Sequence, residues 1–190
     1  MRRHAGLVML AFLSGLGFLP VSASASQYGN SPVAVDLAAE GTQAQLLVRR
    51  CIESAARVHR LPPAMLLILL QVEDGRLGRV SDNSNATVDI GPMQVNETWL
   101  PKVAAHWGVS VPETFVALRD SLCANLEGGA WILRQGIDEA RGDFWQGVGF
   151  YHSHSPEHKA DYLRKVLRQA LRLEAEAGHP VATTTLAAGN

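Results

Sequence analysis

The chain has 190 residues, of which 47% are hydrophobic and 18% are charged, and its formal net charge is −1. The charges are scattered and show no basic excess, so the sequence gives no sign of the positive surface that nucleic-acid binding requires. We therefore expect no nucleic-acid partner.

The N-terminus has the pattern of a secretory signal peptide. Two arginines precede an apolar stretch at residues 6–19, and the small residues 23–25 then offer a cleavage site. A membrane anchor is the alternative, but the stretch is shorter than the roughly 20 residues that a span needs. We predict that residues 1–25 direct export to the periplasm and are removed, and that residues 26–41 form a flexible leader.

About 165 residues (190 − 25) remain after this cleavage, which suits one compact domain with a sizeable core. We predict a single domain over residues 42–177. The last residues, 178–190, are predicted to be a disordered tail because they offer little apolar surface to bury.

Two helices are predicted at the start of the domain. The first has apolar residues at helical spacing and ends near His59: Leu47, Cys51, Ala55 and Val58. The second covers residues 64–73, opens on two prolines and is apolar nearly all round, as expected of a helix that is buried on every side.

A polar segment at residues 75–91 follows and is long for a connection. Helical patterns then resume at residues 99–107, at 112–118, in a longer stretch capped by Asp120, and at 144–151. A final helix opens on Ser155-Pro156, with these side chains predicted to face inward: Tyr162, Leu163, Val166, Leu167 and Ala170. The predicted class is all-α, with at most a small β-hairpin in the polar segment.

The chain contains two cysteines, Cys51 and Cys123. In an oxidising export compartment an even count favours pairing, so we predict a disulfide. Closing a loop of 72 residues (123 − 51) would stabilise the fold by about 4 kcal/mol on the chain-entropy model. Two separately buried thiols are the alternative.

The apolar second helix ends on two adjacent carboxylates, Glu73 and Asp74, before Gly75. At the end of a buried helix, loss of solvent, the helix C-terminus and the neighbouring Asp74 would all raise the pKa of Glu73. A carboxyl that is protonated near neutral pH can act as the general acid in glycosidic cleavage. The alternative, which this stretch alone favours, is that both acids mark the solvent-facing end of the helix.

Residues 89–96, D-I-G-P-M-Q-V-N, place two amides behind a Gly-Pro turn. Gln94 and Asn96 each offer a donor and an acceptor, which suits the hydroxyl and N-acetyl groups of a sugar. This segment favours the catalytic interpretation of Glu73.

Three motifs in this order resemble those of the lytic transglycosylases of the soluble-transglycosylase type: Glu73-Asp74-Gly75, D-I-G-P-M-Q-V-N and G-V-G-F-Y-H-S. The resemblance covers about residues 45–166. The sequences around Cys51 and Cys123, C-I-E-S-A-A and L-C-A-N-L-E-G-G-A, resemble those of the small members that serve secretion, conjugation and type IV pilus machines.

The resemblance implies a goose-lysozyme-like helical domain that cleaves the MurNAc-(β1,4)-GlcNAc bond of peptidoglycan and leaves a 1,6-anhydroMurNAc end. Glu73 would be the sole catalytic acid and base. Met93, Gln94 and Tyr151 would line the glycan groove, with the Tyr151 hydroxyl near Glu73. The expected partners are the glycan strand and proteins of a secretion, conjugation or pilus apparatus, and we expect a monomer.

Two positions depart from the family pattern. Asp74 stands where relatives usually have Ser, and His152 stands where many have Asn. A second carboxylate, Asp74 or Asp89, would allow water to be activated, so a hydrolytic muramidase stays open as an alternative. A catalytically silent wall-binding protein is the third hypothesis.

His152, His154 and His158 lie within one short stretch, and imidazole is the commonest metal ligand. These residues lack an Asp, Glu or Cys at matching spacing, and Ser155-Pro156 interrupts the helical register. We therefore predict no metal site and no cofactor.

Overall fold

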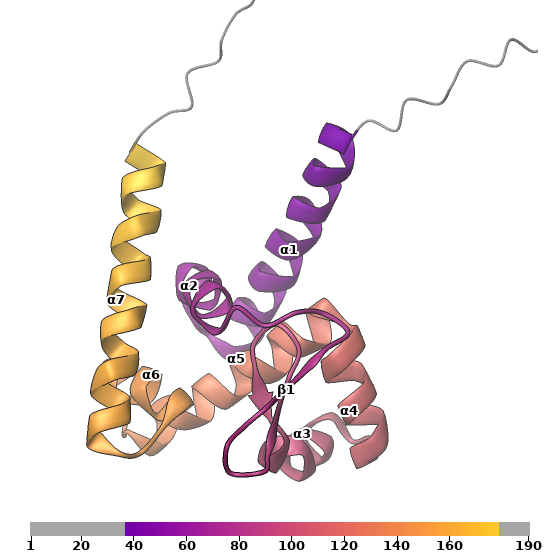
Figure 1. The fold of residues 1–190 in the computed structure, drawn as a ribbon, viewed down its shortest axis with the longest axis vertical. Helices are drawn as coiled ribbons and strands as arrows, with labels where there is room; N and C mark the ends of the chain where they lie inside the picture. The colour runs from indigo at the N-terminus through magenta and orange to yellow at the C-terminus, as the bar shows by residue number, and fades with distance from the viewer. Residues whose placement is uncertain (1–36, 179–190) are drawn as a thin grey trace, which may run out of the picture. The chain divides into compact units, whose positions relative to one another are not determined.

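The computed structural model describes residues 37–178, which contain seven α-helices and a three-stranded antiparallel sheet (Figure 1). In chain order the elements are α1 (Leu37–His59), α2 (Pro63–Glu73), β1 (Val80–Asp82), β2 (Val88–Ile90), β3 (Val95–Asn96), the 3-10 helix η1 (Glu97–Trp99), α3 (Leu100–Trp107), α4 (Val111–Asp120), α5 (Leu122–Glu139), α6 (Phe144–His152) and α7 (Pro156–Gly178). The predicted class, all-α with a small β-element, is confirmed.

Helix α1 begins at Leu37, inside the segment predicted to be the leader. The predicted signal peptide, the rest of the leader and the tail beyond Gly178 lie outside the described residues. Among the described helices, none has both the length and the apolar character that crossing a bilayer requires.

Local sequence signals set several helix ends. Pro63 opens α2, as predicted. Ser110 and Glu113 form a capping box at the start of α4, each side chain accepting a hydrogen bond from the backbone N–H of the other residue.

The N-cap of α5 is Ser121, and not Asp120 as predicted. The Ser121 side chain accepts a hydrogen bond from the Ala124 N–H. Asp120 instead ends α4, where its carboxylate binds Arg119.

Helix α5 lies at the centre of the core. It packs against α1, α4 and α6 and also contacts α2 and β3. The side chains that α5 buries are Asn125, Leu126, Ala130, Ile132, Leu133 and Ile137. Three glycines in its buried face let neighbours approach closely, since at Gly136 a Cβ would lie 2.9 Å from the Gly147 carbonyl oxygen of α6.

The buried face of α1 includes the predicted Cys51 and Ala55 but not the predicted Leu47 and Val58. Leu47 and Val58 are 52% and 64% exposed, whereas the buried residues are Cys51, Ile52, Ala55, Ala56 and His59. Helix α1 packs on both α2 and α5. The side chains that it buries are therefore those that face these two helices. Leu167 of α7, predicted to face inward, is likewise 56% exposed, because α7 contacts α2 and α6 through Tyr162 and Val166.

The predicted disulfide is confirmed. Cys51 in α1 is bonded to Cys123 in the first turn of α5, with the two Cα atoms 4.8 Å apart. The bridge spans 72 residues, for which the chain-entropy model gives about 4 kcal/mol of stabilisation. A disulfide is compatible with an exported protein.

The sheet occupies the polar segment after α2 and extends beyond it. Strand β2 pairs antiparallel with β1 and with β3, so the strand order follows the chain. The pairing places Asp89 opposite Asn96. This register brings a carboxylate and an amide from the same motif side by side.

Candidate active site

Glu73 is the last residue of α2, and α2 lies between α1 and α7 (Figure 1). Asp74 ends the helix in the left-handed conformation, with φ 50°, and its N–H donates to the Leu70 carbonyl. The Glu73 side chain is partly buried. The hydroxyl of Tyr162 in α7 donates a hydrogen bond of 2.5 Å to Glu73 Oε1.

The surroundings of Glu73 raise the pKa of its carboxyl from 4.5 to about 7, and burial is the largest cause. The negative charge of Asp89 raises this pKa further, while the hydrogen bond from Tyr162 and the charge of Lys165 lower it. The expected effect of burial is thus present, but the second carboxylate that acts on Glu73 is Asp89, whereas the side chain of Asp74 is exposed. Near neutral pH, Glu73 can both give and accept a proton.

The turn after Glu73 packs tightly on the turn at residues 91–94. The Gly75 N–H donates to the Pro92 carbonyl at 3.2 Å. A Cβ at Gly75 would lie 2.1 Å from the Gly91 carbonyl oxygen and 2.6 Å from Gln94 Nε2. Only glycine allows this approach, which explains why a glycine follows the two carboxylates.

The side chain of Asn125 in α5 holds the turn at residues 91–94 in place. Its side chain is fully buried and accepts from the Met93 N–H at 2.7 Å, while its Nδ2 donates to the carbonyls of Ile90 and Leu118 at 2.9 and 2.8 Å. Gly91 has φ 67° and would place a Cβ 2.5 Å from Asn125 Nδ2. The central helix therefore fixes the D-I-G-P-M-Q segment, which in turn contacts the end of α2.

Asp89 and Asn96 form a hydrogen-bonded pair across β2 and β3. Asn96 Nδ2 donates to Asp89 Oδ1 at 2.8 Å and to Thr87 Oγ1 at 2.9 Å, and its Oδ1 accepts from the N–H and hydroxyl of Thr98. The amide of Asn96, predicted to bind substrate, is thus engaged within the protein. Its role in this structure is to hold the carboxylate of Asp89.

The remaining predicted site residues are arranged around the same turn. Gln94 is partly exposed beside Gly75, and its Nε2 donates to the Gly91 carbonyl at 2.9 Å. Met93 was expected to line the groove, but its side chain is 0% exposed and packs against Gly129.

The Tyr151 hydroxyl donates to the Met93 carbonyl at 2.8 Å. Burial raises the pKa of the Tyr151 phenol, and the negative charge of the nearby Glu73 raises it further.

Tyr162, the hydrogen-bond partner of Glu73, was not predicted as a site residue. The periodicity of the last helix did place it on the inward face, and the packing of α7 against α2 turns this core position into a contact with the carboxylate. The ring of His152 stacks on Tyr162 with centroids 4.7 Å apart and planes 6° from parallel. Burial lowers the pKa of His152, so the imidazole beside Tyr162 is neutral at neutral pH.

We expect Tyr162→Phe to raise the pKa of Glu73 above about 7, because it removes a hydrogen bond that favours the charged carboxylate. Carbon-13 NMR of the glutamate carboxyls would measure this titration. Tyr151→Phe is the matched control, since the Tyr151 hydroxyl binds a carbonyl rather than the carboxylate. An unchanged titration in Tyr162→Phe would contradict the assigned hydrogen bond.

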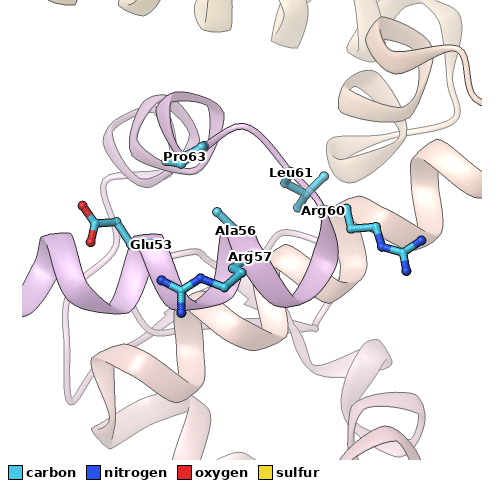
Figure 2. A pocket seen from close by; sticks show the side chains of 6 residues that line it. All are labelled: Glu53, Ala56, Arg57, Arg60, Leu61 and Pro63. Atoms are coloured by element: carbon cyan, nitrogen blue, oxygen red, sulfur yellow. The ribbon is translucent and has the colours of Figure 1, made fainter.

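Two surface hollows lie away from Glu73, between α1 and α2. One, of about 430 Å³, is lined by Glu53, Ala56, Arg57, Arg60, Leu61 and Pro63 (Figure 2). The other, of about 580 Å³, is more apolar and is lined in part by Val48, Ile52 and Leu67. Glu53, the acid that lines both hollows, is paired with Arg49 and its side chain is 44% exposed, so neither hollow offers a buried acid like Glu73.

No protein-family model matches this chain, and none of the curated proteins searched matches it. The interpretation of the site therefore depends on the residues and their geometry, together with the motif resemblance described above.

Proposed function

We propose that this chain is a periplasmic peptidoglycan lytic transglycosylase with a goose-lysozyme-like domain and Glu73 as its catalytic acid and base. The observation that carries the proposal is the partly buried carboxyl of Glu73, with its pKa raised to about 7. A general acid works best when its pKa lies near the working pH. The adjoining turn, which presents Gln94 beside Gly75, supplies an amide for the sugar.

In the proposed reaction, protonated Glu73 gives its proton to the glycosidic oxygen between MurNAc and GlcNAc as the C1–O bond breaks. The substrate's N-acetyl group helps to stabilise the positive charge at C1. The C6 hydroxyl of the same MurNAc then attacks C1, and its proton passes to the Glu73 carboxylate. A 1,6-anhydro ring forms, no water is consumed, and the acid is regenerated.

Hydrolysis is the second candidate, and Asp89 is the observation that favours it. Its charge acts on Glu73, so it is near enough to influence the same reaction, and two carboxylates can divide the roles of acid and base. Asp89 is, however, bonded to the amide of Asn96, which holds it in place within the sheet. The tight turn at Gly75 and the exposure of Asp74 leave Asp74 a weaker candidate for the second carboxylate.

Product analysis in water enriched in oxygen-18 separates these reactions. We expect purified protein to release anhydro-muropeptides from peptidoglycan, each lighter by one water than the hydrolytic product and free of oxygen-18 by mass spectrometry. Asp89→Asn should change the rate but keep the anhydro product.

Reducing ends that carry oxygen-18 would instead establish a muramidase. If folded protein bound peptidoglycan and gave no products, a silent wall-binding role would replace the proposal. We propose that such an enzyme opens the wall locally for a secretion, conjugation or pilus machine. Deletion of the gene, followed by assays of these three processes, would test this.

A further inference from the structure

A second cluster of polar side chains lies away from Glu73, where three helices meet. It consists of His59 at the end of α1, His106 in α3 and Glu127 in α5. His59 Nε2 and His106 Nε2 lie 2.7 and 3.1 Å from the same atom, Glu127 Oε1. All three potential ligand atoms lie within 4.8 Å of one another.

Two of the three separations are close to those of a tetrahedral zinc site. Zinc binds imidazole nitrogen and carboxylate oxygen at about 2.0–2.2 Å, and tetrahedral angles then place any two ligand atoms about 3.3 Å apart. The nitrogen-to-oxygen distances of 2.7 and 3.1 Å would lengthen by about 0.6 and 0.2 Å, and the third separation, which is within 4.8 Å, would shorten by at most about 1.5 Å. Small rotations of the side chains would therefore admit an ion.

The three side chains are also held in place by their neighbours. The His59 side chain is only 6% exposed. The His106 ring stacks on Trp131, with centroids 4.8 Å apart and planes 14° from parallel. The indole N–H of Trp107 donates to Glu127 Oε2, the oxygen that the histidines do not approach. Bonds of this kind orient the ligands of metal sites and strengthen metal binding.

We propose that His59, His106 and Glu127 bind one divalent transition-metal ion, with Zn²⁺ as the best fit, through His59 Nε2, His106 Nε2 and Glu127 Oε1. The ion replaces the two histidine hydrogen bonds to Oε1, and each imidazole then carries its proton on Nδ1. The His106 side chain is 32% exposed, which gives the ion access and leaves the fourth position to water.

The ion would connect α1, α3 and α5 and so stabilise the fold, without taking part in the chemistry at Glu73. The proposal goes beyond the proposed function and does not depend on it. The sequence gives no signal for this site, because its ligands are separated by up to 68 residues and form none of the short spacings by which such sites are found.

Calorimetric titration of the tag-free protein with Zn²⁺ tests the proposal. We expect one bound ion per chain, a higher Tm with Zn²⁺, and intense visible absorption of the Co²⁺ form, as a tetrahedral site gives. His106→Ala should weaken Zn²⁺ binding by about tenfold or more, as should Trp107→Phe, which frees the Glu127 carboxylate.

His154→Ala is the matched control, because His154 pairs with Glu139 at 2.8 Å on an exposed surface and should not affect binding. Circular dichroism would confirm that His106→Ala, at the exposed edge of the cluster, remains folded. The proposal is overturned if the wild-type protein binds no ion, if His106→Ala binds as tightly as the wild type, or if His154→Ala loses the site equally.

Discussion

Glu73→Gln is expected to reduce glycan cleavage by a factor of about 10²–10⁴, the contribution that a general acid typically makes. Gln cannot donate a proton to the glycosidic oxygen, yet it has the same shape and its carbonyl can still accept the hydrogen bond from Tyr162. The loss should therefore appear in kcat, with peptidoglycan binding retained. Release of soluble muropeptides over time measures the rate.

The same substitution should stabilise the fold at alkaline pH. The pKa of Glu73 is about 7 in the folded protein and ordinarily 4.5, so above pH 4.5 the unfolded chain releases a proton that the folded chain retains. Stability is consequently lost as the pH rises from about 4.5 to 7. Because Gln carries no such proton, Glu73→Gln should gain up to about 3 kcal/mol at pH 8 relative to pH 4.

Urea unfolding at pH 4 and pH 8 measures this difference. Glu53→Gln is the control, since Glu53 lies on α1 in an ion pair with Arg49 and has a 44% exposed side chain. It should keep full activity. A stability gain in Glu73→Gln together with undiminished cleavage would show that the buried acid is real but is not the catalyst.

Asn125→Ala is expected to lower the free energy of unfolding by about 5 kcal/mol. It leaves three groups without their partner, the Met93 N–H and the carbonyls of Ile90 and Leu118, and each unpaired buried group costs about 1–3 kcal/mol. The turn at residues 91–94 would lose its anchor to α5, so the approach of Gly75 would loosen and cleavage should fall as well. Chemical denaturation measures the change in stability.

Asn85→Ala is the matched control for this prediction. Asn85 is exposed in the turn between β1 and β2, where its side chain accepts hydrogen bonds from Thr87. Its loss should cost about 1 kcal/mol or less. A similar small cost for Asn125→Ala would mean that the buried groups find new partners, and that the turn is not held by this amide.

The sequence by itself determined the local elements of this protein. Apolar residues at helical spacing, prolines in first turns and the polar break after Glu73 depend only on neighbours in the chain. They predicted the helical class, the start of α2 at its prolines and of α7 at Ser155-Pro156, and the segment that holds the first two strands of the small sheet. The two cysteines predicted the disulfide because no other pairing was available.

The tertiary structure alone decided which side chains meet. Periodicity placed Tyr162 inside but could not say that it would face Glu73, and the motif around Asn96 could not show that its amide would hold Asp89. The same holds for Asn125, 32 residues from Met93. A helical stripe fixes which residues share a face, whereas the partner of that face is chosen by packing between elements that are distant in sequence.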